Sequence, residues 1–145
     1  MLAGCLMHDF EECIGVELLE NLHKKSLELK QLYDGAAQGH SFGLSERSPK
    51  FTVDQGDLLE YDWWSKADLV LANSTCFEFQ LMLKIAEKAS LMKKGAWMIT
   101  LTKKLPCLDP IYNKTNTLGE WECVMSIKMP MSWGFATVNI QRKVL

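Results

Sequence analysis

Short apolar runs alternate along this chain with longer segments in which apolar residues recur at helical spacing. The first half predicts a strand at 13–16 closed by Glu17, a helix over roughly 18–33, and a short strand at 51–53. Asp34-Gly35 is expected to end the helix, and the segment up to Lys50 is expected to be a loop. The helix is predicted to bury one apolar face, made of Leu18, Leu22, Leu29, Leu32 and Tyr33.

The second half continues the alternation. A strand is predicted at 67–72, ending at Asn73, and another at 96–101. Between them, Thr75-Cys76-Phe77-Glu78 has the form of a capping box, which predicts a helix running to about Lys93. Two antiparallel strands are predicted at 121–129 and 136–142. Strands and helices in this order indicate an α/β fold, with a mainly parallel sheet that ends in a C-terminal antiparallel hairpin.

Composition narrows the class of protein. The chain has 145 residues, of which 48% are hydrophobic and 23% are charged. This length and composition predict that residues 1–145 form one domain with a sizeable core. The net charge of −2 gives no sequence-wide attraction to nucleic acid, and the chain carries no direct nucleic-acid motif. No apolar run reaches about 18 residues, so no membrane span is predicted.

The five cysteines and three histidines do not form a metal-binding pattern. The cysteines are scattered without a C-x-x-C pair, and no histidine stands at ligand spacing from one of them. No metal site is therefore predicted. The cysteines are expected to be reduced thiols in a reducing compartment.

Three predicted parallel strands each deliver a polar residue at the carboxyl end: Glu17, Asp57 just after the second strand, and Asn73. In open α/β sheets, ligands bind beyond the carboxyl ends of the strands. A carboxylate there can accept hydrogen bonds from both hydroxyls of a ribose, and a second can accept from an adenine amino group. Each residue taken alone could equally be a turn or loop residue.

Several strings around these positions resemble a known family. They are Gly15-Val16-Glu17, Gly56-Asp57-Leu58, Leu71-Ala72-Asn73 with Phe77, and Met92-Lys93-Lys94-Gly95 before a strand. In order and spacing they resemble class I S-adenosylmethionine-dependent methyltransferases. More narrowly, the chain resembles the non-SET histone-lysine methyltransferases first known as disruptors of telomeric silencing. The similarity extends through Lys103-Lys104-Leu105-Pro106 to Ser132-Trp133-Gly134.

The resemblance implies a cofactor, S-adenosyl-L-methionine, and residues that bind it. The acid that matches Glu17 binds the ribose, the acid that matches Asp57 faces the adenine, and Leu58 packs on the adenine ring. Asn73 corresponds to the asparagine beside the methyl donor and is the expected catalytic residue.

The resemblance also implies a substrate. Phe77 and Trp133 match aromatic residues that line a lysine channel, and Phe135 stands where the family has a tyrosine. The implied activity is histone-lysine N-methylation, with a histone or nucleosome as partner and the nucleus as location; the cytoplasm is the other reducing compartment that fits. An aromatic wall suits this chemistry because it excludes water and favours a cationic donor through its π faces.

One defining family element is absent from the sequence. The strand ending in D-x-G-x-G, whose backbone holds the methionyl part of the cofactor, has no counterpart, and Gly4 stands alone. The segment 2–7 matches the end of the helix that follows that loop. We therefore expect an incomplete domain that is truncated, started at the wrong position or divergent, with a strand missing between those ending at Glu17 and Asn73. The cofactor affinity of such a chain should be weak or absent.

Other functions fit the same residues. The chain could methylate another protein or a small molecule, or it could be a non-catalytic scaffold domain that has lost the cofactor site. A nicotinamide-binding domain that uses Glu17 for ribose is a further alternative, although its glycine fingerprint is also absent. The sequence predicts no oligomeric state.

Overall fold

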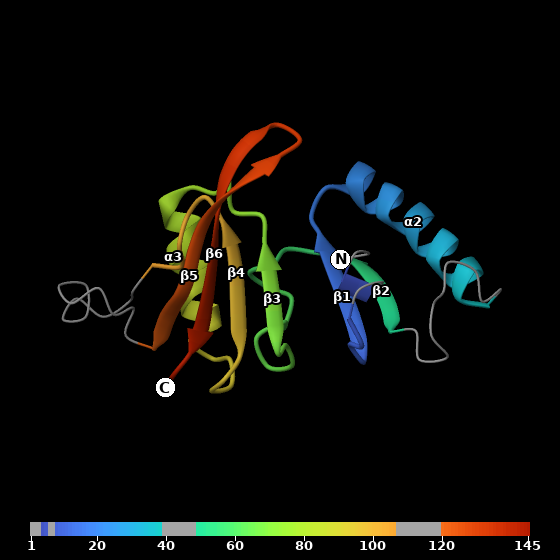
Figure 1. The fold of residues 1–145 in the computed structure, drawn as a ribbon. Helices are drawn as coiled ribbons and strands as arrows, with labels where there is room; N and C mark the ends of the chain where they lie inside the picture. Colours follow the sequence, from blue (N-terminus) through green and yellow to red (C-terminus); the bar gives the residue numbers. More distant parts are fainter. Residues whose placement is uncertain (1–3, 6–7, 39–48, 107–119) are drawn as a thin grey trace. The chain divides into compact units, whose positions relative to one another are not determined.

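The computed structural model describes residues 4–5, 8–38, 49–106 and 120–145 (Figure 1). The chain divides into two compact units, residues 1–61 (unit 1) and residues 62–145 (unit 2). Both units combine helix and strand, as the alternating pattern predicted. None of the described helices is long and apolar enough to cross a membrane.

Unit 1 is a two-stranded parallel sheet with one helix. Strand β1 (Glu12–Glu17) pairs with β2 (Lys50–Gln55), and α2 (Glu20–Gln38) connects them and lies mainly along β2 (Figure 1). The buried core of the unit is small: it consists of Cys5, Cys13, Tyr33 and Phe51, with Phe10 and Val53 packed against it. The Tyr33 ring meets Phe51 edge-on at 5.5 Å, and its hydroxyl donates to the Pro49 carbonyl at 2.9 Å.

Helix α2 departs from the prediction at its end and on its face. It continues through Asp34-Gly35 to Gln38, and an ion pair between Lys30 and Asp34, one turn apart, supports this stretch. Of the five residues expected in the core, only Tyr33 is buried. Leu18 is 61% exposed and precedes the helix, which begins at Glu20 rather than at residue 18. The three leucines within the helix are exposed because a sheet of two strands is too narrow to cover the whole apolar stripe: Leu22 48%, Leu29 47% and Leu32 71%.

Unit 2 is a four-stranded sheet with one helix, in the strand order β3-β4-β6-β5. Strands β3 (Leu69–Ala72) and β4 (Trp97–Leu101) are parallel, and helix α3 (Phe79–Ala89) connects them. Strands β5 (Trp121–Met131) and β6 (Gly134–Lys143) form the predicted antiparallel hairpin, and β6 also pairs antiparallel with β4. The two-residue connection requires a positive φ at Gly134, which is +136°. Glycine adopts this conformation more readily than residues with a side chain do.

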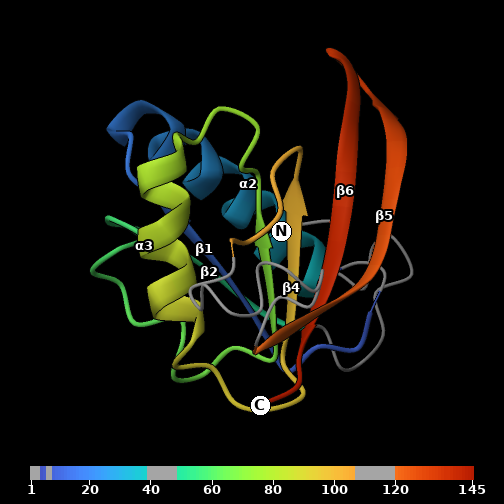
Figure 2. The ribbon, with the colours of Figure 1, turned by 90° about the vertical axis from the view of Figure 1, so that its left-hand side faces the viewer.

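The core of unit 2 lies between α3 and one face of this sheet (Figure 2). The helix buries Met82, Ile85, Ala86 and Ala89, as its spacing predicted. The sheet presents a mixed set of side chains here, all at most 1% exposed: Met98, Thr100, Asn139 and Gln141.

The ends of α3 differ from the prediction. The predicted capping box does not form: the helix begins at Phe79, and Glu78 at its N-cap makes no side-chain cap hydrogen bond. The hydroxyl of Thr75, three residues before the N-cap, instead donates to the side chain of Asn73. The helix ends at Ala89, and Gly95, with φ +87°, lies in the turn before β4.

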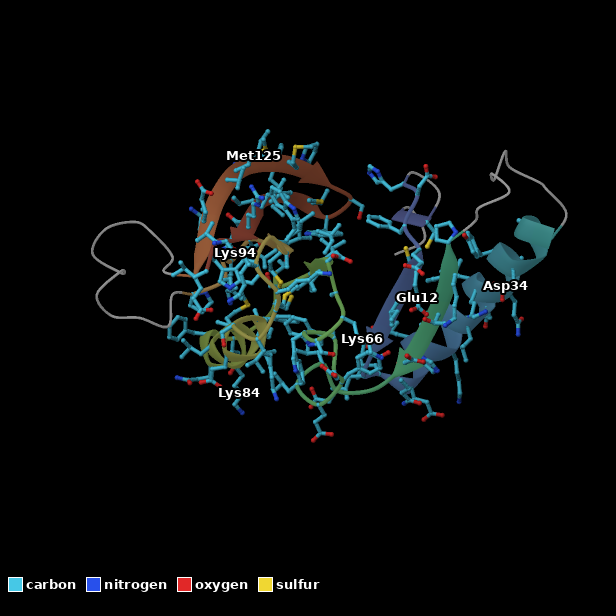
Figure 3. All side chains as sticks on the ribbon, turned by 90° about the horizontal axis from the view of Figure 1, so that it is seen from below. Glu12, Asp34, Lys66, Lys84, Lys94 and Met125 are labelled. Atoms are coloured by element: carbon cyan, nitrogen blue, oxygen red, sulfur yellow. The ribbon has the colours of Figure 1, made fainter. Side chains whose placement is uncertain are left out.

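The second face of the unit 2 sheet carries apolar side chains that α3 does not cover. Register partners point to the same face, and the row Leu71, Ile99, Ile140 and Met125 crosses all four strands. Met125 lies on the side of the sheet away from α3, which carries Lys84 (Figure 3). We call this surface the open face; its exposed members are Leu69 39%, Leu71 56%, Met125 49%, Ile127 45% and Met129 41%.

The described strands form two separate sheets, one in each unit. In the described part of the chain, β1 pairs only with β2 and β3 pairs only with β4, so each strand has an edge without a partner. Such edges present unpaired backbone amides and carbonyls. The prediction of an α/β methyltransferase-like sheet without its first strand agrees with this pairing.

Candidate functional site

Glu17 and Asp57 lie at the same end of the unit 1 sheet. Glu17 is the last residue of β1 and is in register with Gln55, the last residue of β2. The Gly56 amide donates to the Glu17 carbonyl at 3.1 Å, which ties the two strand ends together just before Asp57. The predicted pair of carboxylates is therefore brought to one edge of one sheet.

Each carboxylate has one oxygen fixed by a nearby backbone amide. Glu17 Oε1 accepts from the Leu19 amide at 2.9 Å, and Asp57 Oδ1 accepts from the Leu59 amide at 2.8 Å. The second oxygen of each makes no hydrogen bond to the described residues, so both remain acceptors for a ligand. Leu58 lies partly buried in the turn that follows Asp57.

A third carboxylate nearby is already occupied. The Tyr61 hydroxyl donates to Asp54 Oδ2 at 2.6 Å, and this hydrogen bond is the main cause that raises the pKa of Tyr61 to about 12. The Tyr61 amide also donates to the Asp57 carbonyl at 2.9 Å. Tyr61 thus closes the turn that carries Asp57, and Asp54 is its anchor.

In unit 2, the ends of β3 and β4 are joined by a buried serine. Ser74 is 0% exposed, and its hydroxyl donates to the Leu101 carbonyl at 2.7 Å. Its amide donates to the Ala72 carbonyl at 2.9 Å, which closes a three-residue turn around Asn73. Asn73 is therefore held at the carboxyl edge with its side chain exposed.

Thr102 occupies the matching position at the end of β4. The Lys103 amide donates to the Leu101 carbonyl at 2.7 Å, so Thr102 is also the centre of a three-residue turn. Its φ of 67° makes it the single non-glycine residue with positive φ in the described part of the chain. A β-branched residue held there costs on the order of 1–3 kcal/mol and often marks a functional site.

The two turns are connected by side chains. Thr102 Oγ1 lies 3.2 Å from Thr75 Oγ1, and Thr75 Oγ1 donates to Asn73 Oδ1 at 3.1 Å. The Thr102 amide donates to the Thr137 carbonyl of β6 at 2.6 Å. We call Asn73, Thr75 and Thr102 the rim triad. Asn73 was expected at this edge from its position at the end of a strand, whereas Thr75 was expected to cap a helix. Thr102 was not expected here, because no sequence signal indicates a threonine with positive φ.

The predicted channel aromatics have different surroundings. Phe77 is partly buried just after Asn73, and its carbonyl accepts a hydrogen bond from Lys103 Nζ. Trp133 and Phe135 lie at the hairpin end and are 59% and 69% exposed; Lys128 Nζ stands 4.9 Å from the Phe135 ring centroid. The hairpin extends past the end of β4, which pairs with β6 only at Val138–Arg142 (Figure 1). A channel role for these aromatics stays a prediction.

Other candidate chemistry is absent from the described residues. They contain no group of three or more histidines, cysteines or acids that could hold a metal ion. Four cysteines, Cys5, Cys13, Cys76 and Cys123, are free thiols, while Cys107 lies outside the described residues. Burial first, and then a hydrogen bond with Cys5, raises the pKa of Cys13 to about 12, which makes this thiol unreactive at neutral pH.

The residues present fit one half of S-adenosylmethionine. The free carboxylate oxygens of Glu17 and Asp57 suit the hydroxyl and amino donors of an adenosine group. The methionyl half has no matching element, since the sequence contains no glycine loop of the D-x-G-x-G form. The fit is therefore to adenosine.

Comparison with solved structures identifies the fold. An RNA methyltransferase from Salinibacter ruber in complex with S-adenosyl-L-homocysteine matches with a TM-score of 0.64 and 15% identity, over 99% of this chain and 72% of that one. The fold is that of the class I methyltransferases. The N-methyltransferase NodS from Bradyrhizobium japonicum WM9 matches with a TM-score of 0.56 and 8% identity, over 92% of this chain and 74% of that one.

A third solved structure has the same fold. A SAM-dependent methyltransferase from Methanosarcina mazei matches with a TM-score of 0.51 and 11% identity, over 91% of this chain and 82% of that one. No protein-family model and no curated protein matches the sequence. Between 18% and 28% of these three methyltransferase chains therefore has no counterpart in this one.

Proposed function

We propose that this chain carries the adenosine-binding and acceptor-binding parts of an S-adenosylmethionine-dependent methyltransferase. The observation that carries the proposal is the pair of carboxylates, Glu17 and Asp57, at one sheet edge of a fold shared with solved methyltransferases. In this function Glu17 binds the ribose hydroxyls, Asp57 accepts from the adenine amino group, and Leu58 packs on the ring. The cofactor itself supplies the methyl group on a positively charged sulfonium.

The acceptor we propose is a protein lysine, on a histone. Support comes from the resemblance of the strings around Asn73, Phe77 and Trp133 to the histone-lysine methyltransferases. A lysine must arrive as the neutral amine for its lone pair to attack the methyl group. The Asn73 amide oxygen can accept one N–H of that amine and orient it. The resemblance assigns Phe77, Trp133 and Phe135 to the walls of the lysine channel. The nucleus is the location that this substrate implies.

RNA is a second candidate acceptor, which the charge distribution favours. Unit 1 carries 5 basic and 11 acidic residues, whereas unit 2 carries 11 basic and 7 acidic residues. The net charge of −2 is therefore the sum of −6 for unit 1 and +4 for unit 2. A basic unit with exposed aromatic side chains suits phosphates and unstacked bases. One structure with the same fold is an RNA methyltransferase.

Calorimetry tests the cofactor site. Adenosine and S-adenosylhomocysteine should bind the chain weakly and with similar affinity, because only the adenosine half has matching residues. Glu17→Gln should weaken adenosine binding about tenfold, since the ribose hydroxyls lose a charged acceptor. The control is Glu60→Gln, an exposed acid in the same turn region. Adenosine affinity that is equal in Glu17→Gln, Asp57→Asn and the parent would reject the assignment.

The acceptor is tested separately. Radiolabelled methyl transfer is measured on nucleosomes, free histone and total RNA in parallel. Label in histone lysine supports the first acceptor and label in RNA supports the second. Adenosine binding without transfer to any of them would favour the non-catalytic scaffold reading.

A further inference from the structure

The two threonines of the rim triad are hydrogen-bonded in series to the carboxamide of Asn73. We propose that Thr75 and Thr102 are positioning residues, which fix the rotation of this amide so that its oxygen faces the methyl acceptor. This inference rests on the proposed function, in which Asn73 contacts the acceptor. Its first test does not need catalysis.

The hydrogen-bond order determines which amide atom lies where. Thr102 Oγ1 donates to Thr75 Oγ1 at 3.2 Å, so the single hydroxyl proton of Thr75 is left for Asn73 Oδ1, 3.1 Å away. A carboxamide oxygen has two lone pairs. One is taken by Thr75, and the second remains available for an N–H of an incoming amine.

The opposite rotation would disfavour methyl transfer. If the amide turned by 180°, its NH₂ group would stand where the oxygen was, and it would compete for the amine lone pair that must attack the methyl group. An unrestrained asparagine side chain samples both rotations, because its terminal torsion has a broad, roughly two-fold profile. The threonine chain therefore supplies a restraint that Asn73 cannot supply for itself.

The backbone strain at Thr102 is explained by the same role. Its positive φ places its hydroxyl beside Thr75, while its amide is fixed to the Thr137 carbonyl at 2.6 Å. Buried Ser74 holds the two strand ends together through the Leu101 carbonyl. Three strands thus contribute to the position of one exposed amide.

NMR of the side-chain amides tests this directly. In ¹⁵N-asparagine-labelled protein, Asn73→Asp identifies the Asn73 NH₂ signals. Both protons should exchange with water quickly in the parent, and Thr75→Val should shift the signals, whereas Thr75→Ser should keep them. Thr102→Val should shift them in the same direction by less. Thr52→Val, in the middle of β2, is the control and should leave them unchanged.

Two results overturn the inference. The first is Asn73 signals that are identical in Thr75→Val and in the parent. The second is a parent in which one NH₂ proton is protected and loses protection in Thr75→Val, because the nitrogen would then face Thr75. Thr102→Gly separates strain from hydrogen bonding: it should raise the Tm and still shift the Asn73 signals.

Kinetics provide the second arm. Kinetics are measured with the acceptor that becomes radiolabelled in the methyl-transfer assay. Thr75→Val should lower kcat about tenfold and change the KM for this acceptor by less than about twofold. Thr75→Ser should restore kcat. A parent that binds adenosine but transfers no methyl group rejects the contact of Asn73 with a methyl acceptor and leaves the adenosine site standing, and the NMR result then decides the orientation of Asn73 alone. A rise in KM with kcat unchanged would assign Thr75 to acceptor binding and overturn the positioning role.

Discussion

The two units use the same kinds of element, yet only one of them builds a deep core. In unit 2, α3 packs on four strands, and Ile85 and Met98 are at most 2% exposed. In unit 1, α2 is longer but packs on two strands, and most of its leucines remain exposed. Apolar periodicity predicts which side chains form the apolar face of a helix, whereas the width of the sheet determines how many of them are buried.

The largest expected effect on stability comes from removing a buried apolar side chain in unit 2. It is compared with the removal of an exposed apolar side chain in unit 1. Ile85→Ala should lower the free energy of unfolding by about 2–5 kcal/mol, since it leaves a cavity under α3. Leu32→Ala, on the exposed side of α2, should change it by less than about 0.5 kcal/mol. Urea unfolding followed by circular dichroism measures both. Equal losses would show that α2 is covered in solution and would remove the contrast.

A smaller effect is expected in the core of unit 1. Tyr33→Phe removes the hydroxyl that donates to the Pro49 carbonyl and should cost about 1 kcal/mol. Hydrogen exchange should show the loss in the amides of β1 and β2, while those of β4 and β6 keep their protection. Ser65→Ala is the control, because it removes an exposed hydroxyl that donates to Asp62 outside unit 1 and should leave the protection of β1 and β2 unchanged. Uniform loss of protection along the chain would mean that the two units unfold together.

The smallest effect concerns pH. The pKa of Tyr61 is raised from 10.0 to about 12 by its hydrogen bond to Asp54, so the folded state holds this proton more tightly than the unfolded state does. The resulting stability is complete below pH 10 and is lost as pH rises toward 12. Tyr61→Phe should make unit 1 stability less dependent on pH in this window, as hydrogen exchange or fluorescence would show. The parent slope persisting in the variant would assign it to other groups.

The strands of this fold were largely predictable, and the rim of the site was only partly so. Strand runs such as 96–101 are short, apolar and bounded by glycine or polar residues, so local pattern sufficed. The end of α2 failed because Gly35 signals a stop locally, while the surrounding turn, including the Lys30–Asp34 pair, continues the helix. The capping box at Thr75 failed because the helix begins only at Phe79, and the Thr75 oxygen accepts from the Thr102 hydroxyl instead of from a helix amide.

The site residues also differ in whether the sequence predicts their position. Glu17 and Asp57 could be placed together because parallel strands align their carboxyl ends. Thr102 could not be found, because its role depends on a positive φ that tertiary contacts with Thr137 impose. A residue that is placed by the direction of its strand can be predicted from the sequence. A residue whose backbone conformation depends on contacts with a distant strand cannot.

The hairpin also has a consequence for the speed and order of folding. Only Ser132 and Trp133 separate β5 from β6, so this pair closes the shortest loop in the protein as described and should form within about 1–10 μs. The pairing of β4 with β6 must wait for a far longer loop to close. During synthesis, β3 and β4 leave the ribosome before β6 exists, and in that interval β4 has a neighbour on one side only. A ribosome-bound nascent chain ending just before Gly134 should therefore be more accessible to chaperones than one that includes Lys143.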